Sequence, residues 1–220
     1  MFKIDLKISS VSVESIFKNA VLFKDSHLDQ VAQKSLETLS AFGLKPTQIA
    51  SRAGDQIYNY DLSFPLFNGA GTFRISAEKS EVTFLNATTE KDLEIVLQCV
   101  SRIYEHVPMP PCNTSSISAN AQVVFALPKE GSDFLDSHVD SSKQIGWGGV
   151  LAYVICPNWT PEVRLVIDKS MVYQDGLFLT WSTTHLGNNI SLPTLNAAGK
   201  AFVDAIEKFG LTFSKSHGHE

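Results

Sequence analysis

The sequence predicts an α+β protein made of two βαβββα-like halves, residues 1–112 and 113–220, that fold as one cooperative unit. Several short segments alternate apolar and polar residues, which is typical of half-buried strands. Three longer segments repeat apolar residues at helical spacing. Between the halves lies Val107–Ser116, where three prolines in four residues oppose both helix and strand. We interpret this proline segment as the boundary between the halves.

The first half is expected to contain a strand, a helix, a three-stranded antiparallel meander and a second helix. Ser26 and Thr89 are the expected N-caps of the two helices, and Gly43 is placed to end the first one. Pro65 is expected to end the first strand of the meander. Residues 14–24 fit either a short helix or an irregular crossover. The expected elements lie at residues 2–13 (strand), 26–42 (helix), 58–64, 73–77 and 82–84 (strands) and 89–106 (helix).

The second half repeats this order of elements without repeating the residues. Ser191 is the expected cap of the last helix, Pro193 lies in its first turn, and Gly210 closes it. Because only the pattern recurs, an ancient duplication is a hypothesis. The expected elements lie at residues 117–125 (strand), 131–139 (short helix), 150–156, 163–167 and 177–181 (strands) and 191–209 (helix).

A three-stranded unit with one helix buries one sheet face and leaves strand edges that need partners. Joining two such units edge to edge predicts a curved, mainly antiparallel sheet backed by long helices. The other face of the sheet is then exposed to solvent or forms a concave surface open to a ligand.

Composition argues against several classes of function. The 18 basic and 23 acidic residues are mixed along the chain, which is unlike the clustered basic residues of a nucleic-acid-binding protein. No apolar run is long enough to span a bilayer, and the N-terminus does not resemble a secretory signal. We therefore expect a cytoplasmic protein that binds neither nucleic acid nor membrane. Cys99, Cys112 and Cys156 lack zinc-site spacing, so no metal or other cofactor is expected.

Two histidines are candidate site residues. His138 alternates with Asp136 and Asp140, as an acid–base group or metal ligand would, although helical residues two apart point away from each other. A polar loop or helix face is the simpler interpretation. His185 follows a strand and several hydroxyl residues, and it is either a site residue or an ordinary loop residue.

Tryptophans are the other candidates. Trp147 and Trp159 are placed in turns that flank one strand, a position suited to a pocket mouth or a partner interface. Packing over the end of the sheet is the alternative. With Trp181, His138 and His185 they form the expected ligand or partner surface, and no residue is assigned a catalytic role.

The succession of Tyr58–Phe64, Phe73–Phe84 and the Glu90–His106 helix, followed later by Leu177–Trp181 and Ala197–Phe213, resembles known tandem α+β plans. It resembles the TATA-binding-protein-like and helix-grip classes, and also a sporadically distributed, uncharacterised family of bacterial proteins. The resemblance implies a curved antiparallel sheet backed by long helices. Where that bacterial family has an arginine-rich strand, this chain has Ser-Ala-Asn-Ala-Gln at 118–122, and no site residue is carried over.

These observations together predict a non-enzymatic binding or interaction protein that engages a protein partner or a small ligand through its sheet. An accessory, immunity or defence-associated component of a bacterial cell belongs to this class. Two alternatives stay open. One is a small-molecule carrier or enzyme with a pocket between sheet and helices. The other is a homo-oligomer formed when an edge strand pairs across a two-fold axis.

Overall fold

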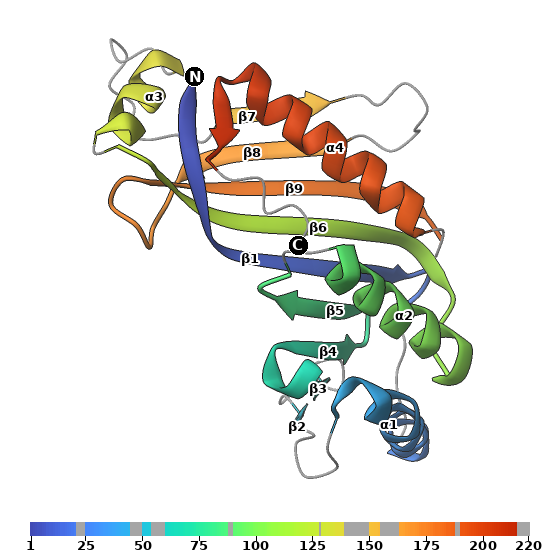
Figure 1. Ribbon diagram of the computed structural model, residues 1–220. Coiled ribbons are helices and arrows are strands. Elements are labelled where there is room, and N and C mark those ends of the chain that lie inside the picture. Colours follow the sequence, from blue (N-terminus) through green and yellow to red (C-terminus); the bar gives the residue numbers. More distant parts are fainter. Residues whose placement is uncertain are drawn as a thin grey trace. The chain divides into compact units, whose positions relative to one another are not determined.

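The chain adopts an α+β fold with an open, mainly antiparallel sheet, as the sequence predicts. The computed structural model describes residues 1–20, 25–44, 50–53, 60–87, 90–127, 129–138, 150–154, 163–187 and 190–214. The helices are α1 (Asp25–Leu39), α2 (Glu90–His106), α3 (Glu130–His138) and α4 (Leu192–Lys208), with 3₁₀ turns η1 (Ser40–Phe42) and η3 (Phe67–Gly69). The strands are β1 (Phe2–Phe17), β2 (Ala50–Ala53), β3 (Tyr60–Leu66), β4 (Gly71–Ser76), β5 (Lys79–Leu85), β6 (Cys112–Phe125), β7 (Val150–Val154), β8 (Val163–Lys169), β9 (Gly176–Leu186) and β10 (Leu211–Phe213). Figure 1 labels α1–α4 and β1–β9 along the chain.

Two compact units make up the chain, and they differ from the expected halves 1–112 and 113–220. Unit 1 contains residues 1–10, 118–183 and 193–220, and unit 2 contains residues 11–117 and 184–192. The long strands β1 and β6 cause the difference, because one end of each belongs to unit 1 and the other end to unit 2.

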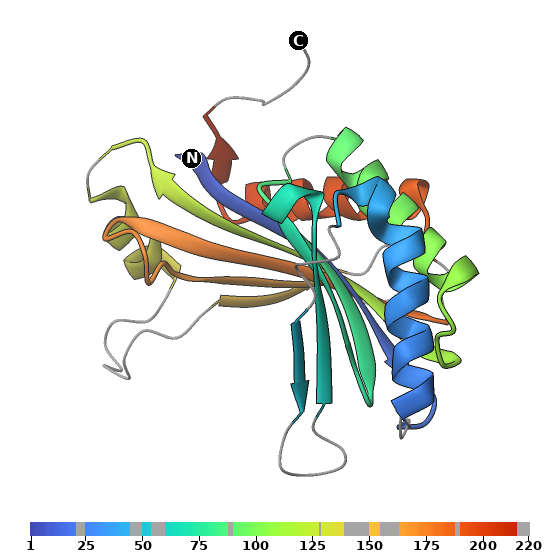
Figure 2. The ribbon, with the colours of Figure 1, turned by 90° about the horizontal axis from the view of Figure 1, so that it is seen from below.

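In unit 2, strands β2, β3, β4 and β5 form an antiparallel meander, and β5 is followed in the sheet by the second part of β1. Side chains alternate between two faces, so that Phe64 and its register partner Phe73 are both buried, with ring centroids 5.4 Å apart. Helices α1 and α2 lie side by side on this buried face (Figure 2). The opposite face is polar, and there Arg74 on β4 pairs with Asp61 on β3.

In unit 1, the first part of β1 is followed in the sheet by β6, β9, β8 and β7. Helix α4 crosses β9, β8 and β7 (Figure 1). Strand β10 runs parallel to the start of β1, from Phe2 opposite Leu211 to Ile4 opposite Phe213. The core joins the sheet to α3, α4 and β10 through Ile4, Val123, Phe125, Phe134, Leu165, Ile167, Leu177, Leu179, Ala205, Ile206 and Leu211.

Several element boundaries differ from the sequence prediction. Strand β1 continues to Phe17, so residues 14–17 are extended rather than helical or irregular. Strand β6 begins at Cys112, inside the predicted proline boundary, and β9 continues to Leu186. The sequence prediction lacked β2 and β10. Pro65 does not end the strand as predicted, because it lies inside β3 opposite Thr72 of β4. The described pairing of β3 with β2 ends at Ser63, so the missing N–H of Pro65 removes no described hydrogen bond to β2.

The predicted C-terminal ends of the helices are confirmed, but the expected N-cap of the first helix is not. Gly43, directly after η1, and Gly210, two residues after α4, both adopt positive φ, +81° and +78°. Helix α2 ends at His106, before the prolines, and α3 matches the short helix predicted at 131–139 within one residue at each end. Helix α1 begins at Asp25, one residue before the expected cap Ser26. The second expected cap, Thr89, lies outside the described residues.

Candidate functional site

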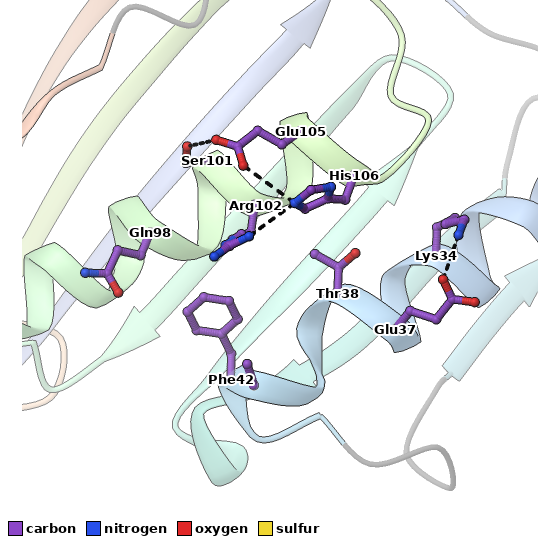
Figure 3. Close-up of a pocket in the computed structure, with 10 residues that line it drawn as sticks. Lys34, Glu37, Thr38, Phe42, Gln98, Ser101, Arg102, Glu105 and His106 are labelled. Carbon is purple, nitrogen blue, oxygen red and sulfur yellow. Dashed lines mark hydrogen bonds and ion pairs between the residues drawn. The ribbon is translucent and has the colours of Figure 1, made fainter.

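A groove between α1 and α2 in unit 2 is the candidate site. It has a volume of about 990 Å³ (Figure 3). A second hollow of about 380 Å³ adjoins it near the proline segment and shares Lys34, Glu105 and His106 with it. The groove is lined by Lys34, Glu37, Thr38, Ala41, Phe42, Gln98, Ser101, Arg102, Glu105 and His106.

The amphipathic pattern of the two helices places these residues at the groove. Val31 and Leu39 of α1, and Cys99 and Ile103 of α2, are buried with at most 1% of their surface exposed. Because these positions repeat every three to four residues, each helix turns one apolar stripe toward the core. The polar residues between the buried positions then flank the gap between the helices.

On α1, the charged residues of the groove are paired along the helix. The Lys34 Nζ donates to Glu37 Oε2 over 2.7 Å, and Gln33 Nε2 donates to Glu37 Oε1 over 3.2 Å. The hydrogen bond from Lys34, together with its positive charge, lowers the pKa of Glu37. Both side chains of this pair are about half exposed, so a bound partner can still reach them.

On α2, His106 has two possible partners at one ring nitrogen. Arg102 Nη1 lies 3.2 Å from His106 Nε2, and because a guanidinium only donates, this contact requires a neutral imidazole with its proton on Nδ1. Glu105 Oε2 lies 3.6 Å from the same nitrogen and forms an ion pair only with the protonated ring. Ser101 Oγ holds the other Glu105 oxygen over 3.0 Å.

An aromatic row supports one end of the groove. Phe42 in η1 points toward α2 (Figure 3), and its ring meets the edge of Phe67 with centroids 6.2 Å apart. Phe67 in turn packs against Phe84 of β5 at 4.7 Å. Phe67 has φ of +54°, which is unusual for a bulky residue, and Asn68 follows with +55°. The surrounding contacts hold this strained turn under the groove.

The structure places the predicted site residue His138 at the end of α3 in unit 1, where it is exposed. Its ring lies 4.5 Å from that of Phe134 and 5.8 Å from that of Phe209, and its Nδ1 is 2.9 Å from the Phe134 carbonyl oxygen. Asp136 is exposed, and Asp140 lies outside the described residues. The described contacts of His138 are therefore with two aromatic rings and with a backbone carbonyl of its own helix.

Two further predicted site residues that the structure describes, Trp181 and His185, do not line the groove. Trp181 is buried in β9 with 4% of its surface exposed. His185 is half-buried near the end of β9, and burial lowers its pKa. Trp147 and Trp159 lie outside the described residues. Trp181 and His138 belong to unit 1, whereas His185 belongs to unit 2.

The two described cysteines differ in exposure. Cys99 is fully buried in α2, and burial raises the pKa of its thiol to about 12. Cys112 is half-buried, with its Sγ 3.2 Å from the Thr114 carbonyl oxygen and 3.3 Å from Ser115 Oγ. Ser115 Oγ also donates to the Gly187 carbonyl oxygen over 2.6 Å.

Within the part of the chain that the structure describes, no three His, Cys, Asp or Glu side chains gather as metal ligands. No described helix is long and apolar enough to cross a membrane.

Sequence reasoning did not identify the groove residues. Apart from Ala41 and Phe42 in η1, each is an ordinary polar residue on the exposed side of an amphipathic helix. The available signal is the spacing of Lys34, Glu37 and Thr38 on α1 and of Ser101, Arg102 and Glu105 on α2 at three to four residues. That spacing does not reveal that the two polar stripes face each other across one gap.

The chain matches no family model and no curated protein. Among solved structures, it is similar to a rolling circle replication initiator protein from Geobacillus stearothermophilus, with 8% identity over 90% of this chain and 80% of that chain and a TM-score of 0.32. An alkyldihydroxyacetonephosphate synthase shows 13% identity over 98% of this chain and 42% of that chain, with a TM-score of 0.21. The di-domain ARO/CYC protein BexL from the BE-7585A biosynthetic pathway shows 9% identity over 91% and 96%, with a TM-score of 0.18. Because all three TM-scores are low, we infer nothing about the function of this chain from these structures.

Proposed function

We propose that this chain is a non-enzymatic protein-interaction module whose α1–α2 groove binds a peptide segment of a protein partner. The observation that carries the proposal is the open groove itself, lined by charged side chains that stay half exposed. The proposal keeps the cytoplasmic location expected from the sequence.

The exposure of the charged residues favours binding over catalysis. Lys34, Glu37, Glu105 and His106 keep 49–56% of their side-chain surface exposed. Catalytic acids and bases are usually desolvated and held by neighbouring groups, which shifts their pKa values toward the working pH. Half-exposed polar groups are typical of the rim of a protein interface, where they select a partner and steer its approach.

The composition of the groove favours a peptide over a small metabolite. Sites for small molecules are mostly apolar and enclose most of the ligand. Here Phe42 supplies an aromatic ring and most other lining residues are polar. The adjoining hollow extends the groove toward Val107 and Pro108, so an extended segment has contacts beyond the first volume.

The charges of the groove define the chemistry of the segment. Arg102 and Lys34 are suited to a carboxylate, and Glu37 and Glu105 to an ammonium or guanidinium group. We therefore expect a segment that carries charges of both signs, spaced so that each meets its opposite across the groove.

The packing beneath the helices supports this proposal over the carrier or enzyme alternative. That alternative needs a cavity between sheet and helices. In unit 2 this space holds Phe64, Phe73, Ile75 and Leu39, all with 0% of their surface exposed, and Ile103 with 1%.

The proposal is tested by selecting peptides from a displayed random library on the purified chain and measuring their affinities by fluorescence anisotropy. Replacing Arg102 and Glu105 by alanine should raise the dissociation constants of the selected peptides by about tenfold or more, because charge-assisted hydrogen bonds contribute roughly 1.5–3 kcal/mol each. The matched control is Glu94→Ala, which removes an exposed carboxylate from α2 outside the groove and should leave affinity unchanged.

Mapping the bound peptide by NMR chemical-shift changes gives a second readout. Changes confined to α1, η1 and α2 support the proposal. Peptides that bind equally well to the Arg102 and Glu105 variants, or that perturb the polar sheet face around Arg74 instead, contradict it.

A further inference from the structure

Arg102 is the basic residue of the groove that has no carboxylate partner among the described residues. The other one, Lys34, is paired with Glu37 on α1 over 2.7 Å. The contact described for Arg102 joins its Nη1 to His106 Nε2 over 3.2 Å, and a neutral imidazole does not cancel the charge of the guanidinium. The remaining N–H groups of Arg102 are therefore available to an acceptor on a bound partner.

The acid that could neutralise Arg102 on the same helix is turned toward other groups. Glu105 lies three residues after Arg102, a spacing at which helical residues can form an ion pair, yet no described ion pair joins the two. Instead, Glu105 Oε1 accepts from Ser101 Oγ over 3.0 Å, and Oε2 lies 3.6 Å from His106 Nε2 (Figure 3). The hydrogen bond from Ser101 thus favours an orientation of Glu105 that leaves the guanidinium unpaired.

Phe42 supplies an apolar surface in the same groove. Both Phe42 and Arg102 line it, and the Phe42 ring points from η1 toward α2 (Figure 3). The edge contact with Phe67, whose ring centroid is 6.2 Å away, holds this ring in place. A ring that is already fixed packs against an apolar side chain at little cost in conformational entropy. The groove therefore offers one segment both a guanidinium and an aromatic surface.

The two acids of the groove are less available than Arg102. Glu37 already accepts hydrogen bonds from two side chains of α1, and Glu105 accepts one from Ser101. A cation on a bound segment has to compete with these donors for the carboxylate oxygens. It therefore gains less free energy than a carboxylate that meets the unpaired guanidinium of Arg102.

We propose that Arg102 determines the specificity of the groove by binding an acidic side chain, aspartate or glutamate, that stands beside an apolar or aromatic residue in the partner segment. This inference rests on the proposed peptide-binding function and narrows the peptides that the groove selects. The carboxylate forms bidentate hydrogen bonds with the guanidinium, and the apolar neighbour packs on Phe42. Ser101 is a positioning residue, because it keeps Glu105 from competing for Arg102.

Anisotropy titrations of the library-selected peptides on the full chain test the proposal. Replacing the acidic residue of a peptide by its amide should raise the dissociation constant by about tenfold or more, whereas replacing a basic residue by glutamine should raise it less. Arg102→Gln should cause a similar loss, and the two changes together should cost little more than either alone. Lys91→Gln is the matched control, because it removes an exposed cation of α2 outside the groove and should leave affinity unchanged.

A double-mutant cycle on α2 tests the role of Ser101. Ser101→Ala alone should raise the dissociation constants of the acidic peptides by about twofold, because Glu105 is then free to pair with Arg102. In the Glu105→Gln background the same change should have no effect. A direct hydrogen bond from Ser101 to the peptide would give equal losses in both backgrounds, and that result would overturn the positioning role.

The outcomes separate this inference from the function on which it rests. Peptides that perturb α1 and α2 in NMR spectra but bind the Arg102→Gln variant as tightly as the unmodified chain overturn the specificity assignment and leave peptide binding in place. Peptides that lose affinity only when their C-terminal carboxylate is amidated also overturn it, in favour of a chain end. Failure to select any peptide that perturbs these helices overturns both proposals. Circular dichroism of the variants, whose replaced side chains are exposed, should match that of the unmodified chain.

Discussion

Replacing Gly43 by alanine perturbs the end of α1 at the point where it meets the turn beneath the groove. Gly43 has φ of +81°, and a Cβ there would lie 2.9 Å from both the backbone nitrogen and the Oδ1 of Asn68. The left-handed conformation costs an alanine about 1–2 kcal/mol. The contact with a backbone atom adds overpacking of roughly 1–3 kcal/mol, because the Asn68 nitrogen cannot rotate away as a side chain can. We expect Gly43→Ala to lower the free energy of unfolding by about 2–5 kcal/mol in total.

Gly210→Ala separates the two contributions. Gly210 ends α4 with φ of +78°, and nothing lies within 4 Å of a Cβ built on it. This variant should therefore lose about 1–2 kcal/mol, the conformational contribution alone. Urea unfolding followed by circular dichroism measures both changes. Equal losses for the two variants would refute the steric argument, and so would a larger loss for Gly210→Ala.

Two further predictions concern the core of unit 2. Phe73→Ala should lose about 3–5 kcal/mol of unfolding free energy in urea, because its fully buried ring stacks on Phe64. Arg74→Ala on the exposed face beside it should change stability by about 1 kcal/mol or less, and similar losses for both would contradict the assignment of faces. Cys99, whose buried thiol has a pKa of about 12, should resist a thiolate-directed reagent at pH 8 while Cys112 reacts, as peptide mass spectrometry can show. Faster labelling of Cys99 than of Cys112 in the folded chain would refute the argument. An unfolded cysteine has a pKa near 8.5, below that of the buried Cys99 thiol. The stability that burial of the neutral Cys99 thiol provides is therefore complete below about pH 8.5 and is lost as the pH rises toward 12.

The fold class and most elements could be predicted because each rests on a local signal. Gly43 and Gly210 adopt the left-handed conformation that their position after a helical pattern predicts. Strand β1 was predicted too short because its buried face carries Ser15 between Val13 and Phe17, and a buried hydroxyl breaks the apolar alternation. Ser15 lies 3.4 Å from Ser115 of β6, a partner 100 residues away that no local pattern reveals.

The groove could not be predicted because it depends on how two helices pack. Lys34 and Arg102 are ordinary exposed residues of amphipathic helices when either helix is considered alone. The sequence instead drew attention to aromatic residues in turns. The one predicted tryptophan that the structure describes, Trp181, is buried in a strand, where its size serves packing.

The shared strands also determine the order in which the chain can fold during synthesis. Most of unit 2 is the continuous segment 11–117, whose meander and two helices can pair as soon as they leave the ribosome. Residues 1–10 are made before unit 2, but their partners in unit 1 begin at residue 118 and end with β10 at Leu211–Phe213. The edge of β1 that pairs with β10 therefore stays without its partner until Leu211–Phe213 have been translated. During that interval this short segment is where a chaperone would have most to protect.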